Sequence, residues 1–160
     1  MQNHLGNGMD DQHWMQLALA EAQDAFARGD WPTGAVIVKD GRLLSRGQNR
    51  QCTTGNPLLH AEPDAIVRAL AEHGPGAVEG ATLYCTMEPC PMCAGALGLA
   101  GIHTLVVALR HSALRRTDMG SFTVEAFAAM TGRPLVLRAG VLEADCLALR
   151  RRWGRDRVAG

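Results

Sequence analysis

The sequence has no net charge and no long hydrophobic run. Its 160 residues carry 16 Lys and Arg against 16 Asp and Glu. This balance argues against a strongly electropositive nucleic-acid binder, because such affinity comes largely from neutralising phosphates. No apolar run approaches the ~20 residues that cross a bilayer, and the opening MQNHLGNGMDDQ lacks the basic and apolar regions of a secretory signal. Five cysteines, an odd number, indicate thiols in a reducing compartment. We therefore expect a soluble, cytoplasmic chain with no membrane partner.

The chain also lacks an internal repeat, a low-complexity tract and any linker-like segment. Its length suits one ordinary domain with a buried core. Apolar residues at 47% and charged residues at 20% are close to the average for globular proteins. We therefore predict a single domain over residues 1–160.

The cancelled charge is unevenly distributed along the chain. Up to Leu109 there are six Lys and Arg against eleven Asp and Glu, and from Arg110 onward there are ten against five. Much of the basic excess lies in residues 150–157. Such a tail fits the last turn of a helix, where cations suit the negative end of the helix dipole, or an edge that touches phosphate or RNA. We favour the helix turn.

Hydrophobic spacing predicts the secondary structure. Apolar residues at i, i+3 and i+4 predict a helix over 10–28. Asp40 and Gly41 between two apolar runs predict a β-hairpin with a type I′ turn, and residues 47–56 have the polar composition of a loop. The remaining chain alternates between predicted helices at 62–73, 92–100, 123–130 and 142–152 and predicted strands at 81–86, 103–109 and 134–138.

This alternation is typical of βαβ units with right-handed crossovers and parallel strands. The predicted sheet is mixed, because an antiparallel hairpin precedes three parallel strands. With helices on both faces, the expected fold class is α/β, a three-layer α/β/α sandwich around a five-stranded sheet.

Two short segments carry the residue types of a metal centre: residues 60–63 (HAEP) and 88–93 (EPCPMC). Pro63 and Pro91 are tolerated in a helix only in its first turn, so each segment predicts the start of a helix. In an open α/β sheet such helix starts meet at the carboxyl edge of the parallel strands. The three candidate metal ligands brought together there are His60, Cys90 and Cys93.

Two thiolates and one neutral imidazole give three protein ligands for a zinc ion. A structural zinc site has four protein ligands, whereas a catalytic site leaves the fourth position for water. Cys85 and Cys146 are the candidates for a fourth ligand, and we expect both to be buried core thiols instead; Cys52 has no evident role. Glu62, two residues after the His, is placed to accept the proton of a bound water whose pKa falls to ~7.

The pattern H-x-E followed by P-C-x-x-C is the known signature of zinc deaminases. Residues 60–62 and 86–96 together resemble the cytidine/deoxycytidylate deaminase superfamily, in the branch of guanine deaminases and tRNA adenosine deaminases. Residues 32–38 are similar to the first strand of that branch, and residues 47–50 to its base-contacting segment. The resemblance covers about residues 14–152 and implies a cytidine deaminase-like fold.

The resemblance also implies the parts of the site. It implies one zinc ion per chain held by the three ligands, with Glu62 as the catalytic proton shuttle. Asn49 would hydrogen-bond the substrate ring, and backbone amides around Ala61 and Cys90 would polarise the leaving side. Asp118 lies in the loop where a guanine-binding carboxylate would lie. Residues 115–122 match neither the guanine deaminases nor the tRNA adenosine deaminases closely. The family further implies a homodimer.

Other interpretations of these residues stay open. The Cys-x-x-Cys pair is also typical of a redox pair, the zinc site could be structural, and a related fold could bind its ligand without turnover. His103 and His111 flank an apolar strand and are expected to be structural. Trp153 could stack on a base, although a Trp at this position more often packs.

The substrate is the least determined feature. Neutral net charge favours a free nucleobase or nucleoside, such as guanine, cytosine or a related aminated heterocycle, as a small-molecule partner. Asp64, after the catalytic segment, would repel phosphates near the pocket mouth. We therefore predict hydrolytic deamination of a free base or nucleoside, with a tRNA adenosine-to-inosine deaminase as the alternative. The basic second half of the chain supports that alternative.

Overall fold

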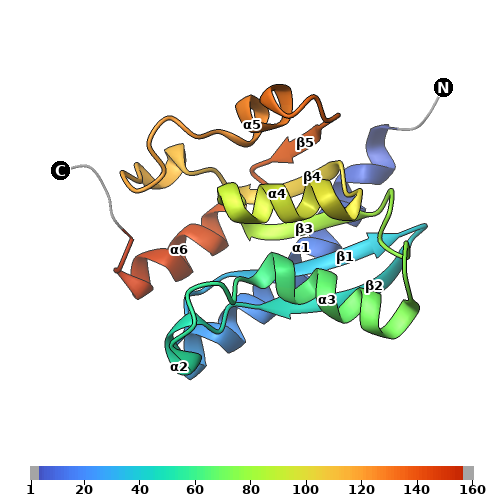
Figure 1. Cartoon of the computed structure of the whole chain (residues 1–160). Helices are drawn as coiled ribbons and strands as arrows, with labels where there is room; N and C mark the ends of the chain where they lie inside the picture. Colours follow the sequence, from blue (N-terminus) through green and yellow to red (C-terminus); the bar gives the residue numbers. More distant parts are fainter. Residues whose placement is uncertain (1–3, 157–160) are drawn as a thin grey trace.

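A five-stranded sheet lies between two layers of helices (Figure 1) in the computed structural model, which describes residues 4–156, with side chains from residue 10 onward. The strand order is β2-β1-β3-β4-β5. The strands are β1 (Gly34–Lys39), β2 (Arg42–Gln48), β3 (Thr82–Met87), β4 (Thr104–Leu109) and β5 (Val136–Ala139). The helices are α1 (His4–Arg28), α2 (Gln51–Thr54), α3 (Ala61–His73), α4 (Pro91–Ala100), α5 (Val124–Met130) and α6 (Glu143–Trp153), with a short 3₁₀ turn at Ser112–Leu114.

The strand directions confirm the predicted mixed sheet. β1 pairs antiparallel with β2 and β3, whereas β3, β4 and β5 run parallel. The turn between β1 and β2 has Asp40 at φ 51° and Gly41 at φ 71°. Both values lie in the left-handed region that a type I′ turn requires, so this prediction is also confirmed.

Each face of the sheet has its own hydrophobic core. Alternate residues of β1 point to opposite faces: Ala35 and Ile37 pack with residues of α3, α4 and α5, and Val36 and Val38 pack with residues of α1 and α6. This is the predicted three-layer α/β/α sandwich. The sandwich architecture does not test whether residues 1–160 form a single domain, so that stays a prediction. None of the helices in the described part of the chain is long and apolar enough to cross a membrane.

The structure differs from the sequence-based prediction at two segments. The first helix begins at His4 rather than at residue 10, and the predicted loop over 47–56 contains the end of β2 and the short helix α2. α2 is held from a distance, because the carboxylate of Asp30 accepts hydrogen bonds from the backbone N–H and the hydroxyl of Thr53, each at 2.8 Å. No local pattern signals such a contact.

Gly47 in β2 fixes the position of the first turn of α3. A Cβ at this residue would lie 2.1 Å from the carbonyl oxygen of Ala61 and 2.6 Å from the backbone nitrogen of Ala65. Only glycine permits this approach of helix and strand backbones. The approach places the helix start, and the candidate site residues on it, directly against the sheet.

Candidate metal and catalytic site

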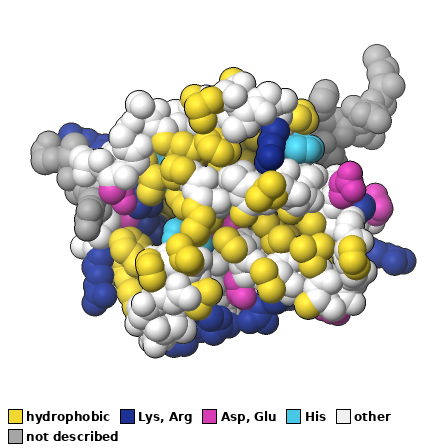
Figure 2. Space-filling view, viewed as in Figure 1, with side chains coloured by type: hydrophobic (Ala, Val, Ile, Leu, Met, Phe, Trp, Pro, Cys, Tyr) yellow, Lys and Arg dark blue, Asp and Glu magenta, His cyan; other side chains and the backbone are white. Residues whose placement is uncertain are grey.

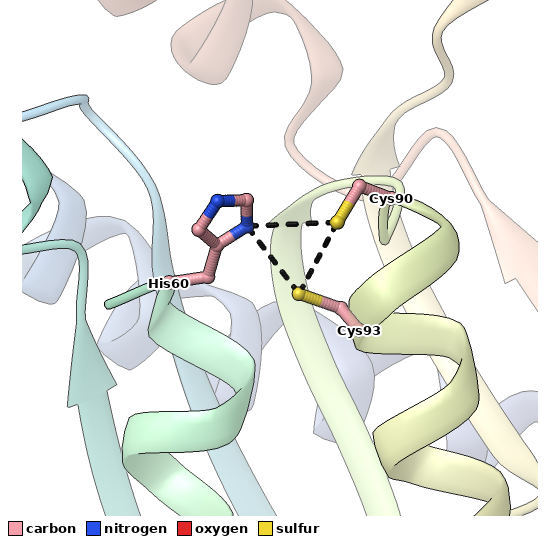
Figure 3. A group of neighbouring side chains, drawn as sticks. All are labelled: His60, Cys90 and Cys93. Carbon is pink, nitrogen blue, oxygen red and sulfur yellow. Dashed lines mark hydrogen bonds between the residues drawn. The ribbon is translucent and has the colours of Figure 1, made fainter. Parts of the chain in front are cut away.

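Three side chains meet at the N-termini of α3 and α4 (Figure 3). His60 is the N-cap residue of α3 and Cys90 is the N-cap residue of α4, both with extended backbone. Cys93 lies in the first turn of α4, and Pro91 is its first residue. The predicted meeting of two proline-containing helix starts is therefore confirmed.

The ligand atoms form a nearly equilateral triangle. Nδ1 of His60 lies 3.6 Å from Sγ of Cys90 and 3.4 Å from Sγ of Cys93, and the two sulfurs are 3.5 Å apart. Tetrahedral zinc, with Zn–S of ~2.3 Å and Zn–N of ~2.1 Å, separates such ligand atoms by about 3.6–3.8 Å. The spacing and the donor chemistry of the three side chains therefore fit a zinc ion.

Within residues 10–156, His60, Cys90 and Cys93 form the only group of three or more His, Cys, Asp or Glu side chains whose ligand atoms all lie within 4.8 Å of one another. Cys85 and Cys146 are both buried, as expected of core thiols. Cys146 packs with α1 on the other face of the sheet. Three protein ligands correspond to the open form of a zinc site, in which one coordination position is left for a reactant.

Glu62 lies directly beside the ligand triangle. Its carboxylate is only 3% exposed, with Oε2 3.4 Å from Sγ of Cys93 and Oε1 3.5 Å from Sγ of Cys85. Burial raises the pKa of Glu62 above that of a free glutamate, and this effect outweighs the opposing attraction of His60. The contact with Cys85 could not be predicted from the sequence, because it depends on which face of β3 the thiol occupies.

The ligands polarise one another. The hydrogen bond with Cys93 lowers the pKa of the Cys90 thiol to about 4, helped by His60. The same hydrogen bond, with burial, raises the pKa of Cys93. Burial lowers the pKa of His60, but the hydrogen bond with Cys90 and the charge of Glu62 outweigh it and the net shift is upward. Cys90 thus has thiolate character, which is the form that binds metal.

A buried carboxylate that sequence reasoning missed supports the Cys90 turn. Glu88 accepts hydrogen bonds from the backbone N–H groups of His111, at 2.8 Å, and Val124, at 3.3 Å. Arg110 also pairs with it, at 3.1 Å. Burial would raise the pKa of Glu88, but these donors lower it overall. Glu88 therefore connects the ends of β3 and β4 to the start of α5. The sequence signal that could have identified Glu88 is its position as an acidic residue directly before Pro89 and Cys90.

A cavity of about 420 Å³ opens beside the ligand triangle. Its lining includes His60, Glu62 and Cys90, and two further predicted site residues, Asn49 and Asp118. Lining residues that sequence reasoning did not assign to the site include Trp31, Thr33, Gln51, Met87, Arg116, Met119, Arg150 and Arg155.

The predicted substrate contacts have different surroundings. Asn49 is 3% exposed, and its amide group donates to Oε1 of Gln51 at 2.6 Å while accepting from the Gln51 backbone at 3.0 Å. Ala61 is the first residue of α3, and its side chain packs in the core. Asp118 is held by two hydrogen bonds from Arg116, which also lower the pKa of its carboxyl.

The argument from Asp64 against a phosphate-bearing substrate is wrong. Its carboxylate accepts from Nε of Arg68 at 2.9 Å and from the backbone of Gln48 at 3.0 Å. The charge is thus paired, and Asp64 does not line the cavity. His111, in contrast, does line it, with Nε2 3.2 Å from the carbonyl oxygen of Pro89. Trp153 packs against Phe26 and Trp31.

Known proteins match this chain along most of its length. The family model of the cytidine and deoxycytidylate deaminase zinc-binding region matches residues 9–109. A tRNA-specific adenosine deaminase of Streptococcus pyogenes is 35% identical over 148 residues, which cover 91% of this chain and 92% of the relative. A tRNA-specific adenosine deaminase of Agrobacterium fabrum is 44% identical over 93 residues, 58% of this chain and 61% of the relative.

Solved structures share the fold. One, from a study of A-to-I editing by tRNA deaminases at the wobble position of transfer RNA, has a TM-score of 0.75 and 34% identity, covering 86% of this chain and 98% of that chain. A guanine deaminase from Nitrosomonas europaea has a TM-score of 0.75 and 26% identity, covering 89% and 83%.

These matches correct the substrate prediction. Free nucleobase or nucleoside deamination, with a small molecule as the partner, is contradicted by relatives that are named tRNA-specific adenosine deaminases and align along nearly the whole chain. The prediction gave too much weight to the net charge of zero and too little to the basic excess from Arg110 onward.

Proposed function

This chain belongs to the cytidine and deoxycytidylate deaminase family, and we propose that it deaminates an adenosine of tRNA to inosine. It is a zinc-binding deaminase, a hydrolase of C–N bonds. The observation that supports a tRNA substrate is the alignment with a tRNA-specific adenosine deaminase along nearly the full length of both chains. The guanine deaminase structure shares the fold at lower identity.

His60, Cys90 and Cys93 would hold the zinc ion. When bound, zinc supplies a Lewis acid that lowers the pKa of a water molecule to about 7, so that hydroxide is available at neutral pH. The two sulfurs and the imidazole are already at suitable spacing, so their geometry needs little rearrangement.

Glu62 would move the protons of the reaction. Burial favours its protonated form more than in a free glutamate, so the carboxylate can take a proton from the attacking water and release it again. The proton would go first to the purine ring nitrogen next to C6 and then to the departing amino group. Adenosine and water thereby become inosine and ammonia.

Three further residues are proposed to contact or position the base. The side-chain amide of Asn49 donates one N–H to Oε1 of Gln51. Its second N–H would donate to the substrate. The backbone N–H of Ala61 lies at the first position of α3, where helical N–H groups lack an intrahelical partner, and would polarise the leaving side. Asp118 would meet the substrate as part of its ion pair with Arg116.

The homodimer that the resemblance implies fits one exposed face. Figure 2 shows hydrophobic side chains gathered over α3 and α4, and Leu58, Val67 and Leu99 are 62%, 65% and 83% exposed. Apolar patches of this kind mark protein–protein contacts. Light scattering would measure the mass, and a monomer at micromolar concentration would contradict the dimer. A cytoplasmic location stays a prediction.

The test is inosine formation in an anticodon stem-loop RNA, measured beside ammonia release from free guanine, cytosine and adenosine. We expect the stem-loop to react. Glu62→Gln should retain zinc and lose about a thousandfold in rate, in the range of general acid–base catalysis. Glu72→Gln is the matched control, since Glu72 lies on the exposed face of the same helix. Reaction of a free base alone would contradict the proposal.

A further inference from the structure

The active-site cavity has a second wall that the proposed chemistry does not use. It is built by the segment before β1, which supplies Trp31 and Thr33, and by the C-terminal end of α6 and the turn after it, which supply Arg150 and Arg155. At about 420 Å³, the cavity is larger than a single purine ring system. Part of the cavity lining is thus made of aromatic and cationic side chains.

Arg150 holds this wall together. It is 3% exposed, its Nη1 donates to Oγ1 of Thr33 at 3.0 Å, and its Nε donates to Oδ2 of Asp156 at 3.0 Å. Its guanidinium also lies 5.4 Å from the ring centroid of Trp31. The buried pair with Asp156 fixes the turn after α6, in which Gly154 adopts φ 66°. The C-terminal turn is thus fastened to the segment before β1.

The outer edge of the wall is an aromatic pair with a cation on it. The rings of Trp31 and Trp153 are 5.5 Å apart at 49°, and the guanidinium of Arg155 lies 4.6 Å from the ring centroid of Trp153. Both tryptophans are partly exposed, and Arg155 is exposed. We call these three residues, Trp31, Trp153 and Arg155, the rim.

Among the described residues, the rim contains the one cavity-lining arginine without an ion pair to a carboxylate. Three arginines line the cavity, but Arg116 is paired with Asp118 and Arg150 is paired with Asp156. Within residues 10–156, Arg155 has no ion pair with a carboxylate, and its recorded contact is the ring of Trp153. An exposed arginine beside aromatic faces is a combination with which proteins bind single-stranded nucleic acid, since bases stack on the rings and phosphates approach the cation.

We propose that the rim binds a nucleotide next to the target adenosine, with its base against Trp31 and Trp153 and its phosphate on Arg155. This assignment rests on the proposed tRNA function and adds to it the part of the surface that selects a polynucleotide. The target base enters the cavity beside Glu62, and the neighbouring nucleotide stays at the mouth. The rim thereby distinguishes an RNA substrate from a free base without a large basic surface.

The first test is equilibrium binding of the anticodon stem-loop to the zinc-loaded Glu62→Gln protein, which does not consume its substrate. Arg155→Ala should weaken binding three- to tenfold at about 0.1 M salt and should reduce the slope of log Kd against log salt by about 0.7, the value for one contact with a single-strand phosphate. Arg151→Ala is the matched control, since Arg151 is exposed in the last turn of α6, four residues before Arg155, but does not line the cavity. Equal effects of the two substitutions would overturn the role of Arg155.

The second test measures stacking directly and does not depend on the stability of a rim variant. In a Trp14→Phe background, the remaining tryptophans are Trp31 and Trp153, and RNA should quench their fluorescence. A stem-loop with an abasic site beside the target adenosine should lose this quenching and about tenfold in affinity, whereas an abasic site in the stem should not. Unchanged fluorescence on saturation with the intact stem-loop would overturn the proposal.

The outcomes separate the rim from the function on which it rests. If the wild-type protein forms no inosine in the stem-loop, the proposed function and the rim both fail. If inosine forms but Arg155→Ala matches Arg151→Ala and no quenching occurs, the function stands and the rim assignment fails.

Discussion

The two walls of the active-site cavity are built in different ways. The ligand wall comes from the starts of two helices, and its ligands His60, Cys90 and Cys93 are placed by short local patterns. The other wall joins the segment before β1 to the last helix, with Arg150 reaching Thr33 across 117 positions. Local sequence therefore places each ligand at the start of its helix, whereas access to the cavity and its selectivity depend on one long-range contact between the segment before β1 and the last helix. A substitution in one wall should therefore leave the contacts of the other wall largely unchanged.

The strongest test of this separation removes a ligand. Cys93→Ala should reduce zinc from about one ion per chain to nearly none and abolish inosine formation, because metal binding needs the complete donor set. Stem-loop binding should change less than about threefold, because none of the rim contacts involves Cys93. Metal analysis and a binding titration measure both effects, with Cys52→Ala, at an exposed thiol, as the control. Retention of zinc would show that the ligand assignment is wrong.

The next largest effect should come from Gly47, which presses the ligand wall against the sheet. A methyl group there would lie 2.1 Å from a backbone oxygen, so Gly47→Ala should lower the free energy of unfolding by about 3 kcal/mol. The control is Gly95→Ala, whose added methyl group would meet only Phe127 at 4.0 Å. This change should be neutral or stabilising by up to about 1 kcal/mol, because alanine favours the helix. Denaturant unfolding measures the difference, and equal stabilities would contradict it.

A substitution of Arg150 should affect the second wall alone. Arg150→Met keeps much of the side-chain volume but leaves Asp156 without its partner, so the C-terminal turn should detach from Thr33. We expect KM for the stem-loop to rise about tenfold, with kcat changed less than about threefold and the zinc content unchanged. Steady-state kinetics and metal analysis are the measurements. A fall in kcat at constant KM would place Arg150 in the chemical step instead.

The smallest effect concerns Asp30, which anchors the segment leading into Trp31. Burial would raise its pKa, but the hydrogen bonds from Thr53 and Arg28 lower it overall. A lowered folded-state pKa means that the stabilisation is present above the ordinary aspartate pKa of ~3.9 and is lost as the pH falls through the folded-state value. Asp30→Asn should therefore cost about 1–2 kcal/mol at pH 7 and progressively less below about pH 4. A cost that stays constant down to pH 2 would contradict this explanation.

The sequence was sufficient for the features that depend on neighbouring residues. The type I′ turn at Asp40 and Gly41, the alternation of strands and helices, and the two proline-containing helix starts were predicted and confirmed. The zinc ligands followed from residue type and spacing together with the family resemblance. The turn and each helix start depend on residues a few positions apart, where geometry is restricted, whereas the meeting of His60 with the two cysteines 30 and 33 positions later depends on the fold.

The prediction considered the charges around the site without their partners. It treated Asp64 as a free negative charge, but Arg68, four residues later on the same helix, and the more distant backbone of Gln48 occupy its oxygens. Glu88 is surrounded by donors from two other elements, and Arg150 is buried among residues from both ends of the chain. Which charges are paired, and which remain exposed, is settled only by the assembled fold.

The fastening of Arg150 to Thr33 also has a consequence for the order in which a nascent chain matures. All three zinc ligands have been synthesised once Cys93 has left the ribosome, whereas the opposite wall requires residues near the C-terminus. Because a domain generally folds as a unit, this wall can close only after Arg150 has been synthesised, well after the last candidate ligand. Completion of the cavity therefore depends on the last helix reaching the segment before β1.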